Sequence, residues 1–172
     1  MKLIESKTLG TAQASIEFTS IPQDGTDLVA LFSIRSTRTE NADDGFARFN
    51  GSSANYSGRE LYGDGTNRYS GTTNTSRVGF VIAGANLTAN TLGNGLLYVP
   101  NYTGSTNKSV SLDWVNENNA TLAYLGITAY LWSDTSAITS LLFSAANGNL
   151  VAGSTVSLYK ITKGSDGIVT TS

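Results

Sequence analysis

Two carboxylates, Asp113 and Glu117, come closest in this sequence to a catalytic pair. Glycoside hydrolysis needs two such groups, one acting as an acid and the other as a base or nucleophile. On a continuous strand these residues share a face about 13 Å apart at Cα, from a rise of roughly 3.3 Å per residue, which is wider than either glycosidase geometry. No third residue supports the pair, so we expect a protein that is not an enzyme.

The sequence contains no histidine and no cysteine. Histidine is the usual general base near neutral pH and the commonest metal ligand, and cysteine supplies thiolate ligands and nucleophiles. Most hydrolase triads and most zinc sites are therefore excluded. We expect no cofactor.

Clustered aspartates are the remaining candidates for metal ligands. Asp43 and Asp44 precede a glycine, and Asp64 stands between two glycines with Asn67 close behind. Such oxygen ligands suit calcium, and Asp43, Asp44 and Asp64 are the calcium candidates, although their spacing does not match an EF-hand. The alternative is that these side chains stabilise turns through hydrogen bonds to the nearby backbone. We expect no metal centre.

Tyrosines and arginines in or near polar segments are better candidates for a binding surface. Tyrosine can stack on a sugar ring or anchor a protein interface, and arginine is enriched at interfaces. Some of these tyrosines could instead cap the core with the hydroxyl in water. The interface or ligand candidates are Tyr56, Tyr62, Tyr69, Tyr102, Arg38, Arg59 and Arg68.

Strict alternation of polar and apolar residues indicates the elements that must position these side chains. Residues 109–115 and 14–19 alternate with a period of two, which is typical of a half-buried strand. Trp114 and Trp132 lie on apolar strand faces, so we expect both in the core. The same pattern recurs along the chain between turns rich in Gly, Asn, Ser and Thr.

The pattern predicts about ten or eleven short strands, typical of an all-β fold. We expect an antiparallel β-sandwich, jelly-roll-like. Segments 2–9 and 13–20 are predicted to pair as a hairpin, segments 37–44 and 63–75 to form long loops, and 85–91 to form at most a turn or two of helix. The predicted strands are 2–9, 13–20, 28–35, 46–50, 59–62, 77–83, 95–99, 108–115, 121–132, 137–143 and 154–161.

Length and charge limit the domain count and the partners. The 172 residues fit a single β-sandwich domain, residues 1–172, in which the polar tail 164–172 is predicted to be partly disordered. A net charge of −2 offers no basic stripe, so we expect no nucleic acid partner. The N-terminus lacks the apolar core of a signal peptide, and no stretch approaches the roughly 20 apolar residues of a membrane span. We therefore expect synthesis in a cytoplasm and no membrane partner.

Several short segments together resemble a family of virion surface proteins from tailed bacteriophages. No one motif is specific, but their order covers nearly the whole chain. Lys160 departs from the family, whose members often have glycine after the tyrosine at this point. The segments are Ile16-Glu-Phe-Thr-Ser-Ile-Pro22, Arg35-Ser-Thr-Arg38, Arg48-Phe-Asn-Gly51, Asn55-Tyr-Ser57, Leu61-Tyr-Gly-Asp-Gly65, Val99-Pro-Asn-Tyr102, Asn107-Lys-Ser-Val-Ser111, Glu117-Asn-Asn-Ala-Thr121 and Leu158-Tyr159.

The resemblance implies a capsid decoration (cement) protein or the tip of a tail fibre, and it brings no catalytic residue. A first predicted strand at Lys2 leaves no attachment region, which favours a non-enzymatic decoration protein on the exterior of a phage head. Its expected partners are the major capsid protein and copies of itself, forming a homotrimer through edge strands 2–9 and 154–161. The alternatives are a tail-fibre or tailspike tip that recognises a host surface glycan, and a carbohydrate-active enzyme of the same fold class.

Overall fold

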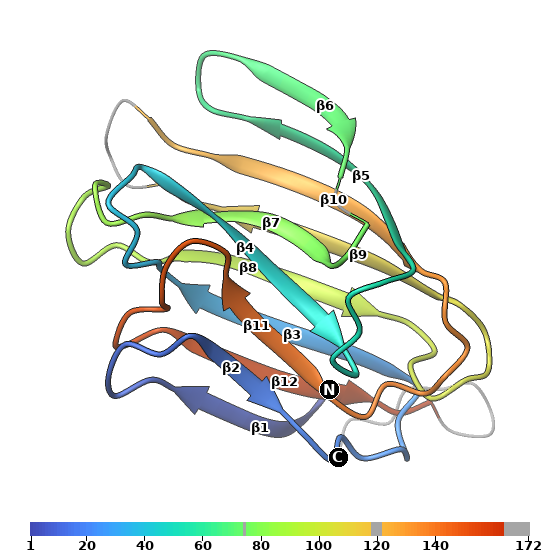
Figure 1. Cartoon of the computed structure of the whole chain (residues 1–172). Coiled ribbons are helices and arrows are strands. Elements are labelled where there is room, and N and C mark those ends of the chain that lie inside the picture. Colours follow the sequence, from blue (N-terminus) through green and yellow to red (C-terminus); the bar gives the residue numbers. More distant parts are fainter. Residues whose placement is uncertain (74, 118–121, 164–172) are drawn as a thin grey trace.

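Two antiparallel β-sheets lie face to face and enclose one apolar core (Figure 1). The computed structural model describes residues 1–73, 75–117 and 122–163, which form twelve strands and no helix. Eight strands build the framework: β1 (Lys2–Thr8), β2 (Ser15–Phe18), β3 (Asp27–Ile34), β4 (Ala42–Phe49), β7 (Val78–Ala83), β8 (Gly93–Val99), β11 (Leu141–Ala145) and β12 (Thr155–Ile161). Four strands are added to it: β5 (Tyr56–Gly63), β6 (Arg68–Thr72), β9 (Lys108–Val115) and β10 (Leu125–Trp132).

The framework has the strand order of a jelly roll. One sheet contains β1-β12-β3-β8 and the other β2-β11-β4-β7. Counted in chain order, these are strands 1-8-3-6 and 2-7-4-5 of an eight-stranded double Greek key. The predicted antiparallel, jelly-roll-like sandwich is confirmed, with twelve strands in the described residues in place of about ten.

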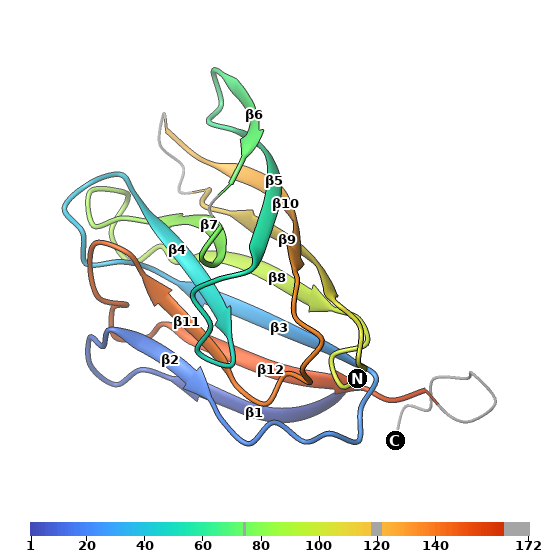
Figure 2. The same ribbon diagram turned by 45° about the vertical axis from the view of Figure 1, so that its right-hand side comes forward.

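The four added strands enlarge only one of the two sheets. They continue it past β8 in the order β9-β10-β5-β6, which gives a sheet of eight strands opposite a sheet of four. The smaller sheet ends at β7, which contacts β8, β9 and β10. The hairpin of β5 and β6 therefore projects beyond the smaller sheet (Figure 2).

Alternating side chains explain why these segments form strands. Along β9 and β10 every second residue is buried, which places Trp114 and Trp132 in the core with 1% of each side chain exposed. The ring centroids of Trp132 and Phe49 are 5.5 Å apart. Those of Phe32 and Phe80, which come from opposite sheets, are 4.9 Å apart. The prediction that both tryptophans belong to the core is confirmed.

The predicted hairpin of segments 2–9 and 13–20 is wrong. β1 pairs with β12 and β2 pairs with β11, so these two neighbours in sequence belong to opposite sheets. Between them, the backbone of Gln13 exchanges two hydrogen bonds with Leu150, of 3.0 and 2.7 Å. The predicted edge position of segment 154–161 is also wrong, because β12 lies between β1 and β3.

Two loop predictions also change, whereas segment 85–91, for which at most a turn or two of helix is predicted, contains no helix. Segment 37–44 is shorter as a loop, since β4 begins at Ala42, and segment 63–75 contains β6. Segment 85–91 forms turns, and four of its carbonyls accept hydrogen bonds from the buried Arg35 guanidinium at 2.7 to 3.0 Å.

Two further expectations concern the tail and membranes. The tail 164–172 and Thr121 lie outside the described residues. In the part of the chain that the structure describes, we find no helix with the length and apolar character needed to span a membrane.

Candidate functional site

The β5–β6 hairpin brings together four of the seven predicted interface residues. Tyr62 and Tyr69 are directly opposite each other in the register of the two strands. Their side chains point toward the inner side of the larger sheet, while Arg59 and Arg68 alternate with them and occupy the outer side. All four are at least partly exposed.

The two tyrosines stack on one another. Their ring centroids are 4.7 Å apart and the planes differ by 19°. Tyr62 also contacts the buried Trp114 ring at 5.9 Å, so the stack continues from the exposed hairpin into the core. Burial is the main cause that raises the pKa of Tyr62. The Tyr69 ring, 41% exposed, forms the outer end of this aromatic row.

Asp64 holds the turn of the hairpin. Its carboxylate accepts hydrogen bonds from the backbone N–H of Asn67 at 2.6 Å and of Thr66 at 2.9 Å, and from the Tyr69 hydroxyl at 3.2 Å. The two backbone donors lower the pKa of Asp64 to about 2, and the contact with Asp64 raises the pKa of Tyr69. The turn-stabilising alternative for Asp64 is therefore the one that its contacts support.

The other two aspartates lie on a different strand. Asp43 is buried in β4 and accepts hydrogen bonds from Ser36 Oγ at 2.6 Å and Asn147 Nδ2 at 2.8 Å. The predicted interface residue Arg38 lies beside it, 3.6 Å from Asp43 Oδ1, away from the hairpin. Asp44 is exposed on the same strand. Across the described residues, no three Asp, Glu, His or Cys side chains converge as metal ligands.

Tyr56 and Tyr102 are buried, so their predicted exposure is wrong. The Tyr56 hydroxyl accepts a hydrogen bond from the backbone N–H of Phe49 at 3.0 Å, and burial raises the pKa of Tyr56 to about 12. The Tyr102 hydroxyl donates to the carbonyl of Pro22. Both rings lie in the core with 3% or less exposed, and each hydroxyl has a backbone hydrogen-bond partner there.

The carboxylate pair considered in the sequence lacks the assumed geometry. Asp113 is exposed on the outer face of β9, whereas β9 ends at Val115 and Glu117 follows it. The two residues therefore do not share one continuous strand.

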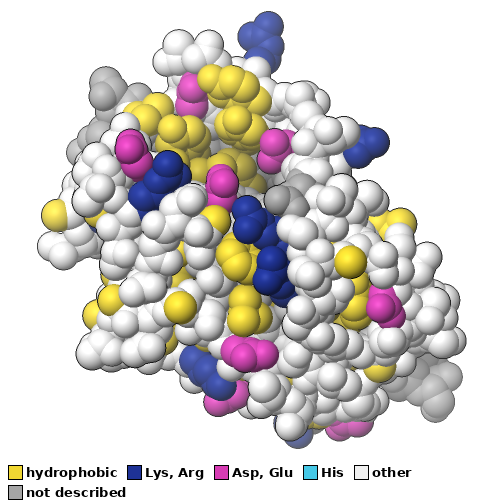
Figure 3. Space-filling view, in the orientation of Figure 1, with side chains coloured by type: hydrophobic (Ala, Val, Ile, Leu, Met, Phe, Trp, Pro, Cys, Tyr) yellow, Lys and Arg dark blue, Asp and Glu magenta, His cyan; other side chains and the backbone are white. Residues whose placement is uncertain are grey.

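A polar cleft of about 250 Å³ separates the hairpin from the smaller sheet. Asp44, Glu60 and Arg77 line it together with Tyr130. Burial and then the neighbouring Asp44 raise the pKa of Glu60. Figure 3 has the orientation of Figure 1. Apolar side chains gather at the top of the molecule in this view, and acidic side chains lie along their border. Sequence analysis missed Glu60, although Glu60 and Tyr62 are two residues apart on one strand and therefore share a face.

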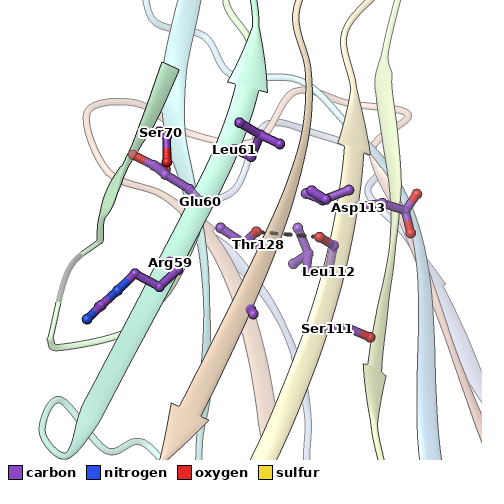
Figure 4. A pocket seen from close by; sticks show the side chains of 10 residues that line it. Arg59, Glu60, Leu61, Ser70, Ser111, Leu112, Asp113 and Thr128 are labelled. Atoms are coloured by element: carbon purple, nitrogen blue, oxygen red, sulfur yellow. Dashed lines mark hydrogen bonds between the residues drawn. The ribbon is translucent and has the colours of Figure 1, made fainter. Parts of the chain in front are cut away.

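The outer face of the added strands forms a second surface that sequence analysis missed. Here a groove of about 540 Å³ runs over β5, β10 and β9 (Figure 4). Four aliphatic side chains are exposed beside or within it: Leu61 by 53%, Leu125 by 64%, Ile127 by 58% and Leu131 by 37%. We call these four residues the aliphatic strip. The signal in the sequence was that segment 125–132 has apolar residues at both odd and even positions. A strand that is buried on only one face needs apolar residues at alternate positions only.

Comparisons with known proteins identify no relative: no family model, no curated protein and no solved structure matches this chain.

Proposed function

We propose that this chain is a non-enzymatic structural protein of a bacteriophage virion, which decorates the exterior of the head and stabilises it as a homo-oligomer. The observation that carries the proposal is the β5–β6 hairpin, which presents Tyr62, Tyr69, Arg59 and Arg68 on strands that extend past the smaller sheet. Tyrosine and arginine are among the residue types enriched where most of the binding energy of protein interfaces is concentrated.

In this role the protein acts mechanically. Each copy contacts major capsid protein subunits, and separating those subunits then requires breaking the added contacts as well. A specific interface of this kind buries about 1,200 to 2,000 Å². Many copies bound to one shell, and several sites joined in one oligomer, increase the overall stability through multivalency.

A reconstitution experiment tests the proposal. Heads of the phage that encodes this chain, prepared without it, are mixed with purified protein, and bound copies are counted by quantitative mass spectrometry. We expect saturation at tens to hundreds of copies and greater resistance of the heads to heat. Tyr69→Ala combined with Arg68→Ala should reduce binding at least tenfold, whereas Leu3→Ala on β1 should not change it. Binding of only a handful of copies per head, or none, contradicts the proposal.

The aromatic row favours one alternative, the tail-fibre tip that recognises a host glycan. The exposed Tyr69 ring lies beside the Asp64 carboxylate, and aromatic faces next to hydrogen-bond acceptors suit sugar rings. Binding of purified host surface polysaccharide, lost in Tyr69→Ala, together with a low copy number on the tail, supports this alternative against decoration.

Absence of catalysis is part of the proposal. A carboxylate pair carried by one strand would need both residues on that strand. Asp113 lies on the outer face of β9, whereas Glu117 follows the end of β9. We therefore expect no hydrolysis of polysaccharides. Turnover that disappears in Asp113→Asn or Glu117→Gln contradicts this expectation.

A further inference from the structure

The two sheets end in the edge strands β1, β6, β2 and β7, and the edge of β7 is closed by side chains of the larger sheet. The Tyr130 hydroxyl accepts a hydrogen bond from the backbone N–H of Gly79 at 2.9 Å. Asn116 Nδ2 donates one to the carbonyl of Val81, also at 2.9 Å. An open row of backbone donors and acceptors is a template for another strand, and these two side chains close that row.

The edges of β2 and β1 are protected in other ways. β2 has four residues, and Lys7 of β1 donates a hydrogen bond to its Glu17 carbonyl at 2.7 Å. β1 shifts register between Leu3 and Glu5 and carries charges at Lys2, Glu5 and Lys7. Short length, irregular register and charged side chains all discourage pairing with a further strand.

β6 has none of these protections. Its five residues pair with β5 in one continuous register and include no proline, no lysine and no carboxylate. All of them are at least partly exposed, and β6 is the last strand of the larger sheet, beyond the border of the smaller one (Figure 1, Figure 2). Among the four edges, that of β6 is therefore the one open to an added strand.

The hydrogen bonds at both ends of the hairpin show which residues of β6 face outward. The backbone N–H of Thr73 donates to the carbonyl of Gly58, and that of Asp64 donates to the carbonyl of Asn67, both at 3.2 Å. Hydrogen-bonded pairs alternate with non-bonded pairs along an antiparallel ladder, so the odd-numbered residues of β6 bond to β5. The backbone N–H and carbonyl groups that point away from β5 are those of Arg68, Ser70 and Thr72.

Positive charge lies on the outer side of this hairpin. Arg68 is at one end of β6, and Arg59 of β5 is paired with Thr72 at the other end. Neither arginine forms an ion pair within the described residues, and the other residues on this side of the two strands are uncharged. A second copy paired antiparallel about Ser70 would bring its own Arg68 beside Thr72 and toward Arg59. Charge therefore favours an acidic strand over another copy.

We propose that β6 accepts an extended acidic segment of the major capsid protein as an added strand of the larger sheet. The outward backbone groups of Arg68, Ser70 and Thr72 hydrogen-bond to the segment, which supplies the affinity in this mode of recognition. Two of its carboxylates, four residues and about 13 Å apart, lie beside Arg68 and Arg59. The inference rests on the proposed function, from which it takes the source of the segment.

A peptide titration tests the edge without heads. The probe is a synthetic threonine heptapeptide with glutamate at its second and sixth positions, added at millimolar concentration to isotope-labelled protein. The amide NMR signals of Arg68, Ser70 and Thr72 should shift more than those of Tyr69 and Gly71, whose N–H groups bond to β5. The same peptide with lysine in place of glutamate should bind at least tenfold more weakly. Equal binding of the two peptides, or no shifts in β6, overturns the inference.

A proline variant tests the backbone contacts. Ser70→Pro removes one outward N–H and keeps the β5–β6 ladder, because proline is tolerated where the N–H of an edge strand faces solvent. It should weaken binding of the glutamate peptide at least tenfold with an unchanged circular dichroism spectrum. The matched control is Ser6→Pro on β1, whose N–H also points away from its neighbouring strand, at the opposite edge of the same sheet. Equal binding by both variants overturns the inference.

A charge variant provides a second test that leaves the backbone unchanged. Arg68→Glu should remove the preference for the glutamate peptide over the lysine peptide, and an unchanged preference overturns the inference. Light scattering tests the other occupant. A wild-type dimer that dissociates in Ser70→Pro shows that a second copy pairs with β6, which also overturns the inference.

Binding of the same variants to heads separates this inference from the proposed function. Heads that bind Ser6→Pro and the wild type but not Ser70→Pro support both. Heads that bind all three equally support decoration and overturn the inference. A protein that pairs with the glutamate peptide through β6 but does not bind heads contradicts decoration and leaves the site for an acidic strand in place.

Discussion

Gly126 of β10 faces the edge of the Trp114 ring of β9, at a position where a side chain has no room. A Cβ atom at residue 126 would lie 2.3 Å from Trp114 Cζ2 and 2.8 Å from Tyr62 Cβ. Gly126 of β10 is paired with Trp114 of β9 on one side and with Tyr62 of β5 on the other. The absent side chain therefore allows the aromatic row to continue from the hairpin into the core.

Gly126→Ala should destabilise the protein by about 1 to 3 kcal/mol, because the added methyl group must displace an indole ring in a close-packed core. Chemical denaturation monitored by tryptophan fluorescence measures the loss. Gly71→Ala in β6 is the matched control, since the nearest atom to its added Cβ is Glu60 Oε1 at 3.9 Å. An equal loss in both variants contradicts the explanation.

Trp114→Ala should cost about 3 to 5 kcal/mol, since it removes a fully buried aromatic side chain and leaves a cavity. Denaturant unfolding checks the value against Ser109→Ala, a substitution on the exposed face of the same strand. A loss below about 1 kcal/mol for Trp114→Ala contradicts the assignment of that face to the core.

Stability should fall at alkaline pH because Tyr56 keeps its proton longer in the folded protein. Burial raises its pKa from 10.0 to about 12, so between these values the unfolded chain loses a proton that the folded protein retains. Its contribution is complete below pH 10 and is lost as pH rises toward 12, at about 1.4 kcal/mol per pH unit. Urea unfolding from pH 9 to 11.5 should show a smaller slope for Tyr56→Phe than for the wild type. Equal slopes contradict the assignment.

Asp64 should titrate with a pKa of about 2, because backbone N–H groups of the hairpin turn stabilise its charged form. That stabilisation of the turn is complete above the ordinary pKa of 3.8 and is lost as pH falls through 2. A carboxyl NMR titration measures the value, and millimolar calcium should not shift the resonance. An ordinary pKa, or a shift caused by calcium, contradicts the structural role of Asp64.

The sequence by itself determined most of the strands but not β6, and it determined which side chains of a strand share a face. In β9 and β10 the period of two fixes which side chains share a face, so Trp114 and Trp132 could be placed in the core without knowing any pairing partner. The turn at Asp64 was also predictable as one of two alternatives, because its hydrogen bonds reach only to residues within five positions.

Strand pairing and the fate of the tyrosines were decided by contacts that are distant in sequence. β1 pairs with β12 at the other end of the chain, and neither strand carries a local signal for that choice. Tyr102 is buried because its hydroxyl reaches the carbonyl of Pro22, 80 positions away. A polar neighbourhood in the sequence therefore predicted exposure wrongly.

The aliphatic strip shows the same division between sequence and tertiary structure. A strand with apolar residues in both phases, as in β10, is typical of burial on two sides. Only the tertiary structure decides that one side of β10 is exposed, because the smaller sheet has four strands and covers a single face of the larger one. The number of strands in each sheet depends on pairing between segments that are distant in sequence. The sequence therefore determined where the apolar side chains occur along the chain, and the assembled sheets determined which of them face solvent.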